Sequence, residues 1–119
     1  MKIAVSSQGT GLDSQVDPRF GRAAYILIID TISSGVEVLD NSENLNAFKG
    51  AGIQTAAMVS DSGAEVLLTG YCGPNAFKTL QAAGVKVAND VAGTVGEAVT
   101  GFSEGKFALA DDANVEGQW

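Results

Sequence analysis

The chain has 119 residues, of which 45% are apolar and 18% charged, and this length and composition predict one globular domain. Its net charge of -7 argues against a nucleic-acid partner, because phosphate binding needs clustered lysines and arginines. With no histidine, histidine-based catalysis and histidine-ligated metals are excluded, and a single cysteine excludes a disulfide framework and a four-thiolate zinc site. No segment reads as a signal peptide or a membrane span, so we expect a cytoplasmic protein with no membrane partner.

Hydrophobic periodicity predicts a strand-rich first half, followed by strands and helices that alternate. The predicted strands are residues 2–7, 23–30, 36–41, 64–70 and 85–89. The predicted helices are residues 53–63, 74–84 and 94–105, and the last begins with a capping box formed by Thr94 and Glu97. We expect one domain over residues 1–107 and a mobile, acidic tail over residues 108–119.

The lengths of the connections predict how these strands pair. Short connections among the first three strands require antiparallel pairing, whereas the later strand–helix–strand units need right-handed crossovers between parallel strands. A mixed five-stranded sheet in the order 3-2-1-4-5, flanked by helices, satisfies both rules. This is the ribonuclease H-like α/β arrangement. Two-metal nucleases of this architecture need carboxylates on the central strands, and residues 2–7 and 66–70 contain none, which argues against nuclease activity.

Glycine-rich loops are expected to meet at one rim of this sheet, where ligands of open α/β sheets bind. Arg19, Arg22 and Lys49, three of the seven basic residues, fall in these loops. Helices expected to start after Gly52 and Gly73 add free backbone N–H groups and positive dipole ends. The rim is therefore predicted to bind an anion.

Acidic neighbours leave a second interpretation of the two arginines open. In this interpretation Arg19 and Arg22 pair with Asp13 or Asp17 and merely hold their loop in place. Such pairs are common and contribute little to stability.

Cys72, the only cysteine, lies between Gly70 and Gly73 where a strand leads into a helix. A nucleophilic role lacks a histidine base. A thiolate of lowered pKa at the helix N-terminus is a second interpretation, and it would allow contact with a metal cluster. The third and favoured interpretation is a small side chain in a turn whose backbone matters more than its thiol.

Four segments together resemble the dinitrogenase iron–molybdenum cofactor biosynthesis family over residues 2–107: "SSQGTGLDSQVDPRFGRAAYILIID", "GAG", "LLTGYCGPNAFKTLQAAGVKV" and "TVGEAVTGF". This family includes NifX-like proteins, the C-terminal domain of NifB and the orange protein of sulfate-reducing bacteria. Because this chain is expected to be a single small domain, it is closest in kind to the orange protein. The resemblance implies a ribonuclease H-like fold and a non-enzymatic protein. It also implies an anionic metal–sulfur cargo, either an iron–molybdenum cofactor precursor or a molybdenum–copper sulfide cluster held without covalent ligation.

The resemblance also implies which residues bind the cluster. The family pattern falls on Asp17, Arg19, Phe20, Gly21, Arg22, Gly50, Gly52, Thr69, Gly70, Gly73 and Pro74. Many relatives carry a histidine where this chain reads "NAFKGAG", so its absence favours non-covalent capture through Lys49, the arginines and backbone N–H groups. The full candidate set is Ser7, Gly9, Arg19, Phe20, Gly21, Arg22, Lys49, Gly50, Gly52, Thr69, Gly70, Tyr71, Cys72, Gly73, Pro74 and Asn75, with Cys72 the only thiol candidate for a metal. The alternative function is a regulatory or interaction module that binds a phosphorylated metabolite, a nucleotide or a protein partner at the same rim.

Overall fold

The structure, a computed structural model, describes residues 1–45 and 50–110 of the chain. Its strands are β1 (Lys2–Ser7), β2 (Tyr25–Asp30), β3 (Val36–Asp40), β4 (Val66–Leu68) and β5 (Lys86–Ala88). Its helices are the 3-10 helix η1 (Phe20–Arg22), α1 (Ser42–Leu45), α2 (Ala51–Asp61), α3 (Pro74–Ala82) and α4 (Val95–Ser103). All five strands and all three longer helices were predicted. The short helices η1 and α1 were not, because a single turn within a polar loop leaves no periodic signal.

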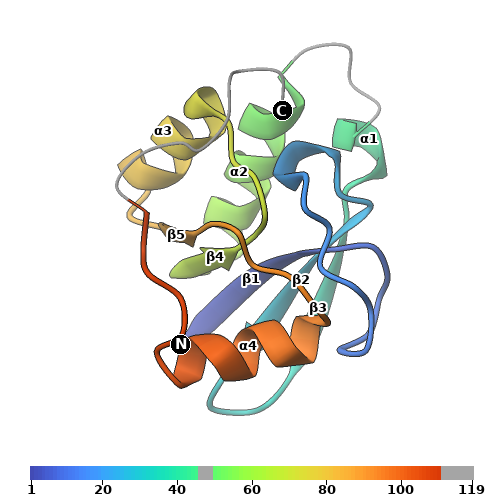
Figure 1. The fold of residues 1–119 in the computed structure, drawn as a ribbon. Helices are drawn as coiled ribbons and strands as arrows, with labels where there is room; N and C mark the ends of the chain where they lie inside the picture. Colours follow the sequence, from blue (N-terminus) through green and yellow to red (C-terminus); the bar gives the residue numbers. More distant parts are fainter. Residues whose placement is uncertain (46–49, 111–119) are drawn as a thin grey trace.

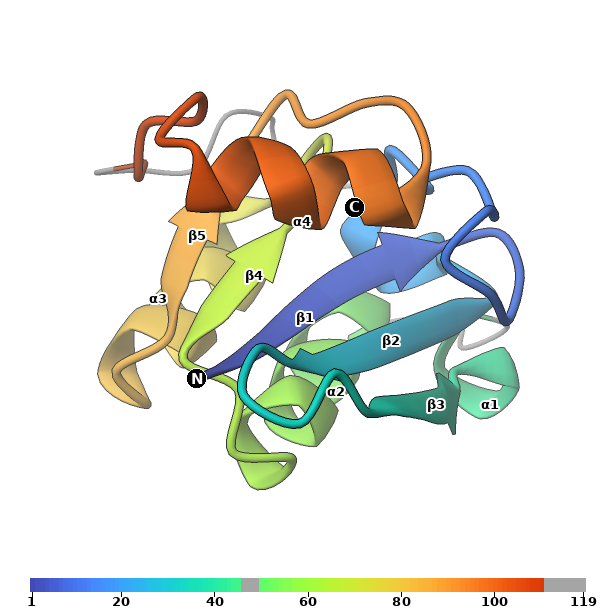
Figure 2. The same cartoon turned by 90° about the horizontal axis from the view of Figure 1, so that it is seen from below.

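The strands form one sheet in the order β3-β2-β1-β4-β5, which confirms the predicted order (Figure 2). β2 is antiparallel to both β1 and β3, whereas β1 is parallel to β4 and β4 to β5. Four strands therefore run in one direction and only β2 runs against them. The carboxyl ends of β1, β3, β4 and β5 and the start of β2 meet at one rim of the sheet, and the loops of interest leave from this rim.

Helices cover the two faces of the sheet unequally. α2 and α3 lie on one face and α4 lies on the other (Figure 1). On the first face Ala56, Val59, Phe77 and Leu80 of the two helices pack against strand residues such as Leu67. On the second face Val95 and Ala98 of α4 pack against Ile3, Val5, Val66 and Leu68. Burial of each large aliphatic side chain contributes about 1.5–3 kcal/mol, so these two layers hold the rim loops in place.

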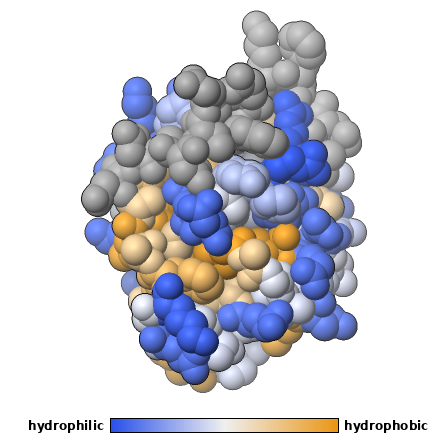
Figure 3. All heavy atoms as spheres, in the orientation of Figure 1, coloured by the Kyte–Doolittle hydropathy of each residue, from blue (hydrophilic) through white to orange (hydrophobic). Residues whose placement is uncertain are grey.

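The chain after α4 returns along the far edge of the sheet. The backbone N–H of Ala110 donates to the carbonyl of Val87 in β5 at 2.7 Å, and Ala110 packs against the first core. The mobile tail predicted for residues 108–119 falls mostly outside the described residues and stays a prediction. Apolar side chains also reach the surface across the middle of the face shown in Figure 3. No helix in the described ranges is long and apolar enough to cross a membrane.

Candidate anion-binding site at the rim of the sheet

The 3-10 helix η1 is inserted between the start of α2 and the loop that joins β4 to α3 (Figure 1). Its contact with α2 is made by backbone. A Cβ placed on Gly21 would lie 2.8 Å from both the N and the Cα of Gly52. No side chain fits there, so glycine at position 21 allows η1 to touch the first turn of α2 directly.

On its other side η1 and the residues before it are fastened to the β4–α3 loop. The N–H of Tyr71 donates to the carbonyl of Pro18 at 2.6 Å, and the N–H of Phe20 donates to the carbonyl of Tyr71 at 3.2 Å. A Cβ on Gly70 would lie 2.7 Å from the Cα and the O of Pro18. Gly21 and Gly70 were predicted as cluster-binding residues. In the structure the missing side chain of each glycine makes room for the backbone of a neighbouring segment.

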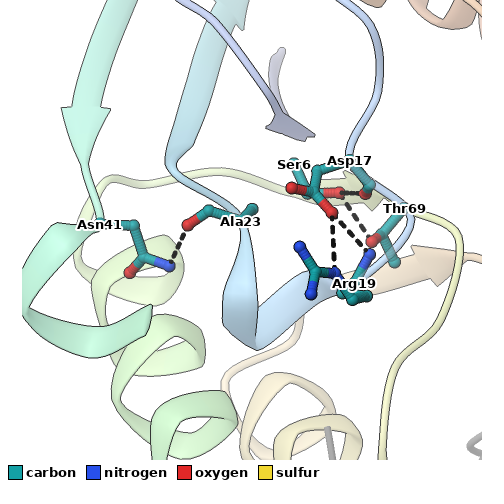
Figure 4. Close-up of polar contacts among 6 residues, drawn as sticks. All are labelled: Ser6, Asp17, Arg19, Ala23, Asn41 and Thr69. Atoms are coloured by element: carbon teal, nitrogen blue, oxygen red, sulfur yellow. Dashed lines mark hydrogen bonds and ion pairs between the residues drawn. The ribbon is translucent and has the colours of Figure 1, made fainter. Parts of the chain in front are cut away.

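Asp17 anchors the loop that carries Arg19 (Figure 4). The residue is 4% exposed, and its backbone is bound on both sides by Ser6, whose carbonyl accepts the Asp17 N–H at 2.8 Å and whose Oγ donates to the Asp17 carbonyl at 2.7 Å. The Ser6 hydroxyl also lies 2.7 Å from Oγ1 of Thr69. These contacts tie the end of β1, the Asp17 loop and the end of β4 into one unit.

The Asp17 carboxylate also orients Arg19. Its Oδ1 accepts the backbone N–H of Arg19 at 3.0 Å and lies 3.7 Å from the Arg19 Nε. The ion-pair interpretation therefore holds for Arg19 with Asp17. The pair does not bury the arginine, whose side chain remains 50% exposed and which engages Asp17 through one of five N–H donors. Pairing and anion binding are thus compatible at this residue.

The helices α2 and α3 both begin at this rim without a side-chain cap. Their N-cap residues are Gly50, in the left-handed region at φ 75°, and Gly73, and neither first turn contains an acidic residue. By contrast, α4 carries the predicted capping box between Thr94 and Glu97. The positive ends of α2 and α3 are therefore not neutralised by their own side chains.

The predicted start of α2 was wrong by one half-turn. The helix begins after Gly50, and Gly52 is a buried residue of its first turn, where it meets Gly21. Ile53, the first residue of the predicted helix, is 44% exposed, because Ala56 and Val59 make the buried face of α2.

Cys72 is fully buried in the first core, in a cluster that includes Phe20 and Phe77. Burial raises the pKa of its thiol to about 12, because a thiolate loses its hydration there. This contradicts the interpretation as a thiolate of lowered pKa. The helix start after Gly73 does not compensate for the loss of water, and Cys72 is a small, neutral side chain in a turn.

The candidate residues divide by their exposure at the rim. Arg19, Gly50, Tyr71 and Asn75 are exposed, and Gly9, Arg22 and Pro74 are partly buried. The buried candidates are Ser7, Phe20, Gly21, Gly52, Thr69, Gly70, Cys72 and Gly73. Lys49 lies outside the described residues. Within residues 1–45 and 50–110, no group of three or more cysteine, aspartate or glutamate side chains is placed to hold a metal ion.

Asn41 was missed by the sequence interpretation. It is fully buried after β3, where its Nδ2 donates to the carbonyl of Ala23 at 2.8 Å and its Oδ1 accepts from Oγ1 of Thr55 at 3.1 Å (Figure 4). Asn41 therefore joins the residue after η1 to α2. Asparagine is common in loops, so its sequence position gave no sign that this one is buried.

The fold defines a small α/β domain built on a mixed five-stranded sheet with an open loop rim. Residues 1–105 match the family described as dinitrogenase iron-molybdenum cofactor, and the chain belongs to this family. Among curated proteins, none matches the sequence. The predicted family is thereby confirmed.

Solved structures agree with this assignment. The apo form of the orange protein from Desulfovibrio gigas is 47% identical, with 96% of each chain covered and a TM-score of 0.94. A structure assigned to a NifB protein from Thermotoga is 40% identical, with 98% of each chain covered and a TM-score of 0.84. A structure assigned to a dinitrogenase from Methanocaldococcus jannaschii, 16% identical over 94% of this chain and 96% of that one, has a TM-score of 0.71 and shows the fold alone. The likeness to the orange protein agrees with the prediction.

Proposed function

We propose that this chain is a non-enzymatic, cytoplasmic carrier that binds an anionic metal–sulfur cluster as cargo at the rim of its sheet. One observation carries the proposal: η1, which directly follows the half-exposed Arg19, contacts the uncapped first turn of α2 and the loop that leads into the uncapped start of α3. The family's connection to the iron–molybdenum cofactor and the apo state of the similar orange protein support a cargo of this kind. The cargo is a molybdenum–copper sulfide or an iron–molybdenum cofactor precursor.

The chemistry of the rim suits a bulky anion held without covalent ligands. Guanidinium groups and helix N-termini donate charge-assisted hydrogen bonds to sulfide as they do to oxyanions. Arg19 and Arg22 are the described cations of the η1 loop, and Lys49 is proposed to join them. Cys72 contributes no thiolate at neutral pH, because its pKa is about 12. Binding therefore depends on charge and backbone donors rather than on sulfur ligation.

Reconstitution tests the proposal. The protein is mixed with tetrathiomolybdate and a copper or iron salt and desalted, and its absorption and bound metal are measured. We expect the double variant Arg19→Gln/Arg22→Gln to lose most of the cargo and Cys72→Ser to lose less. The matched control is Lys2→Gln/Lys86→Gln, which removes the same charge at the opposite ends of β1 and β5. The proposal would be refuted if the unchanged protein retained no colour after desalting. A greater loss of bound metal in Cys72→Ser than in the double arginine variant would make Cys72 a ligand.

The same rim also suits phosphate, because uncapped helix starts and guanidinium groups are common phosphate binders. A regulatory module that binds a phosphorylated metabolite or nucleotide is therefore the second candidate. Thermal-shift measurements in metal-free buffer separate the two functions. Stabilisation by a phosphorylated ligand, together with no uptake of the sulfide cluster, would favour the second.

A further inference from the structure

The second face of the sheet is only half covered. α4 lies over the strands on one side, and β2 and β3 extend beyond it with no described helix above them (Figure 2). Val36 and Val38 of β3 lie opposite Ile29 and Leu27 of β2 and continue the apolar layer of this face into solvent. They are 40% and 42% exposed. The apolar layer thus ends in open solvent at the edge of the sheet.

Other exposed apolar side chains border this uncovered half. Leu12 is 46% exposed, and Ile32, at the tip of the β2–β3 hairpin, is 86% exposed. A hollow of about 310 Å³ separates the hairpin from α4 and is lined by residues that include Leu12, Ile29, Ser34 and Val99. A gathering of large apolar side chains beside a hollow is typical of a protein-binding surface.

The outer edge of β3 offers backbone hydrogen bonds as well. The N–H of Asp30 donates to the carbonyl of Gly35, and the N–H of Asn41 donates to the carbonyl of Ala24. These two pairs show which residues of β3 form backbone hydrogen bonds with β2, because hydrogen-bonded and non-hydrogen-bonded residue pairs alternate along antiparallel strands. Val36, Val38 and Asp40 therefore direct their N–H and C=O groups outwards, and β3 is the end strand among the described strands.

The charge around this edge is acidic. Glu37, Asp40 and Glu43 are exposed on or just after β3, and Asp30 ends β2 at the hairpin, where it lies opposite the basic residue Lys2 of β1. Hydrogen bonds from backbone N–H groups lower the pKa values of Asp30 and Asp40, so both stay ionised. A second copy of the chain would bring the same carboxylates, and residues 111–119 are acidic too. Repulsion between like charges therefore disfavours pairing of the β3 edge with a second copy of the chain or with residues 111–119.

We propose that β3 is a docking edge for an extended, basic segment of a partner protein, which pairs with the outward groups of Val36 and Val38 as a sixth strand. Alternate aliphatic side chains of this segment would cover Val36 and Val38, and its lysines or arginines on the opposite face would lie beside Glu37. The proposal is independent of cargo binding at the rim. It gives a carrier a second surface through which a partner can hold it.

A peptide titration tests the proposal on the full chain. The probe is a short peptide that alternates lysine with valine, and binding is followed by backbone amide NMR shifts. We expect shifts at residues 36–40 and an affinity that falls with salt. The same peptide with N-methyl groups on alternate residues, and a peptide that alternates glutamate with valine, should each bind at least about tenfold more weakly. Equal binding of the N-methylated peptide would overturn strand pairing.

Variants of the chain complete the test. Glu37→Lys and the pair Val36→Ser/Val38→Ser should each weaken the basic peptide about tenfold. Asp61→Lys and Ile53→Ser are the controls, because they make a comparable charge reversal and a comparable change of an apolar residue to serine on exposed residues of α2. Circular dichroism confirms that each variant is folded. Shifts confined to α4, stronger binding of a basic amphipathic helix, or a dimer abolished by Val36→Ser/Val38→Ser would each overturn the proposed occupant.

Discussion

Replacement of Gly70 by alanine tests whether this glycine serves loop packing. The added Cβ would lie 2.7 Å from the Cα and O of Pro18 and 2.9 Å from its Cβ, distances that no relaxed contact shows. The Pro18 loop must move, and the 2.6 Å hydrogen bond from the Tyr71 N–H to the Pro18 carbonyl must lengthen or break. Overpacking costs about 1–3 kcal/mol and a lost hydrogen bond about 1 kcal/mol. The lower entropy of the unfolded alanine chain returns about 0.4–1 kcal/mol.

The net loss expected for Gly70→Ala is therefore about 1–3.5 kcal/mol, a large part of the stability of a typical domain. Urea unfolding followed by far-ultraviolet circular dichroism measures it. Gly35→Ala is the matched control, because its Cβ would meet only the Oγ of Ser33 at 3.2 Å, a hydroxyl that can rotate away. We expect the control to stay within about 0.5 kcal/mol of the unchanged protein. If Gly70→Ala were as stable as Gly35→Ala, the close approach of the two loops would be refuted.

Three further results are expected. Cys72 should react with a thiol reagent only at the rate at which the protein opens, and at once in denaturant, because it is fully buried and its pKa is about 12. Asp17→Asn should keep the acceptor for the Arg19 N–H yet bind tetrathiomolybdate with copper more tightly, because it removes a charge that competes with the cargo; weaker retention of metal would contradict this. Thr94→Ala should destabilise the protein by about 1 kcal/mol in urea unfolding. The hydrogen bonds from Thr94 lower the pKa of Glu97. The ionised Glu97 side chain therefore adds its full contribution to stability above the ordinary glutamate pKa, and this contribution is lost as the pH falls through the lowered pKa of the folded state. Urea unfolding at several pH values would detect the loss.

The fold was predictable because each strand and each longer helix has a strong local signal and the connection lengths permit few topologies. The run over residues 26–29 is wholly buried in β2, and Phe77 and Leu80 share the buried face of α3. The first residue of α2 was harder to predict from the sequence, because "GAG" contains two glycines, Gly50 and Gly52, that could each be the N-cap. Only the structure shows that Gly50 takes the left-handed conformation while Gly52 packs against Gly21.

The site was predictable only in outline. Topology alone places the η1 loop and the starts of α2 and α3 at one rim, because all of them leave from the carboxyl ends of parallel strands or enter the start of β2. The favoured interpretation of Cys72 as a small side chain in a turn agrees with the structure, but the sequence left an activated thiolate open, because a cysteine beside a helix start is activated when exposed and inert when buried. Its burial depends on a core whose members, such as Phe20 and Phe77, lie far from it in sequence or on the next helix.

The pairing of Arg19 with Asp17 changes how anion binding at the rim should be understood. An ion pair with an exposed partner contributes at most about 1 kcal/mol, so a multivalent anion that also meets two helix N-termini can displace it. The backbone bond from the Arg19 N–H to Asp17 does not depend on the guanidinium and would persist after displacement. Asp17 would then hold the Arg19 backbone in place while its side chain turned to the cargo. If the rim binds an anion as proposed, the pair would hold Arg19 ready for it, and the two interpretations of the arginine would describe one residue before and after binding.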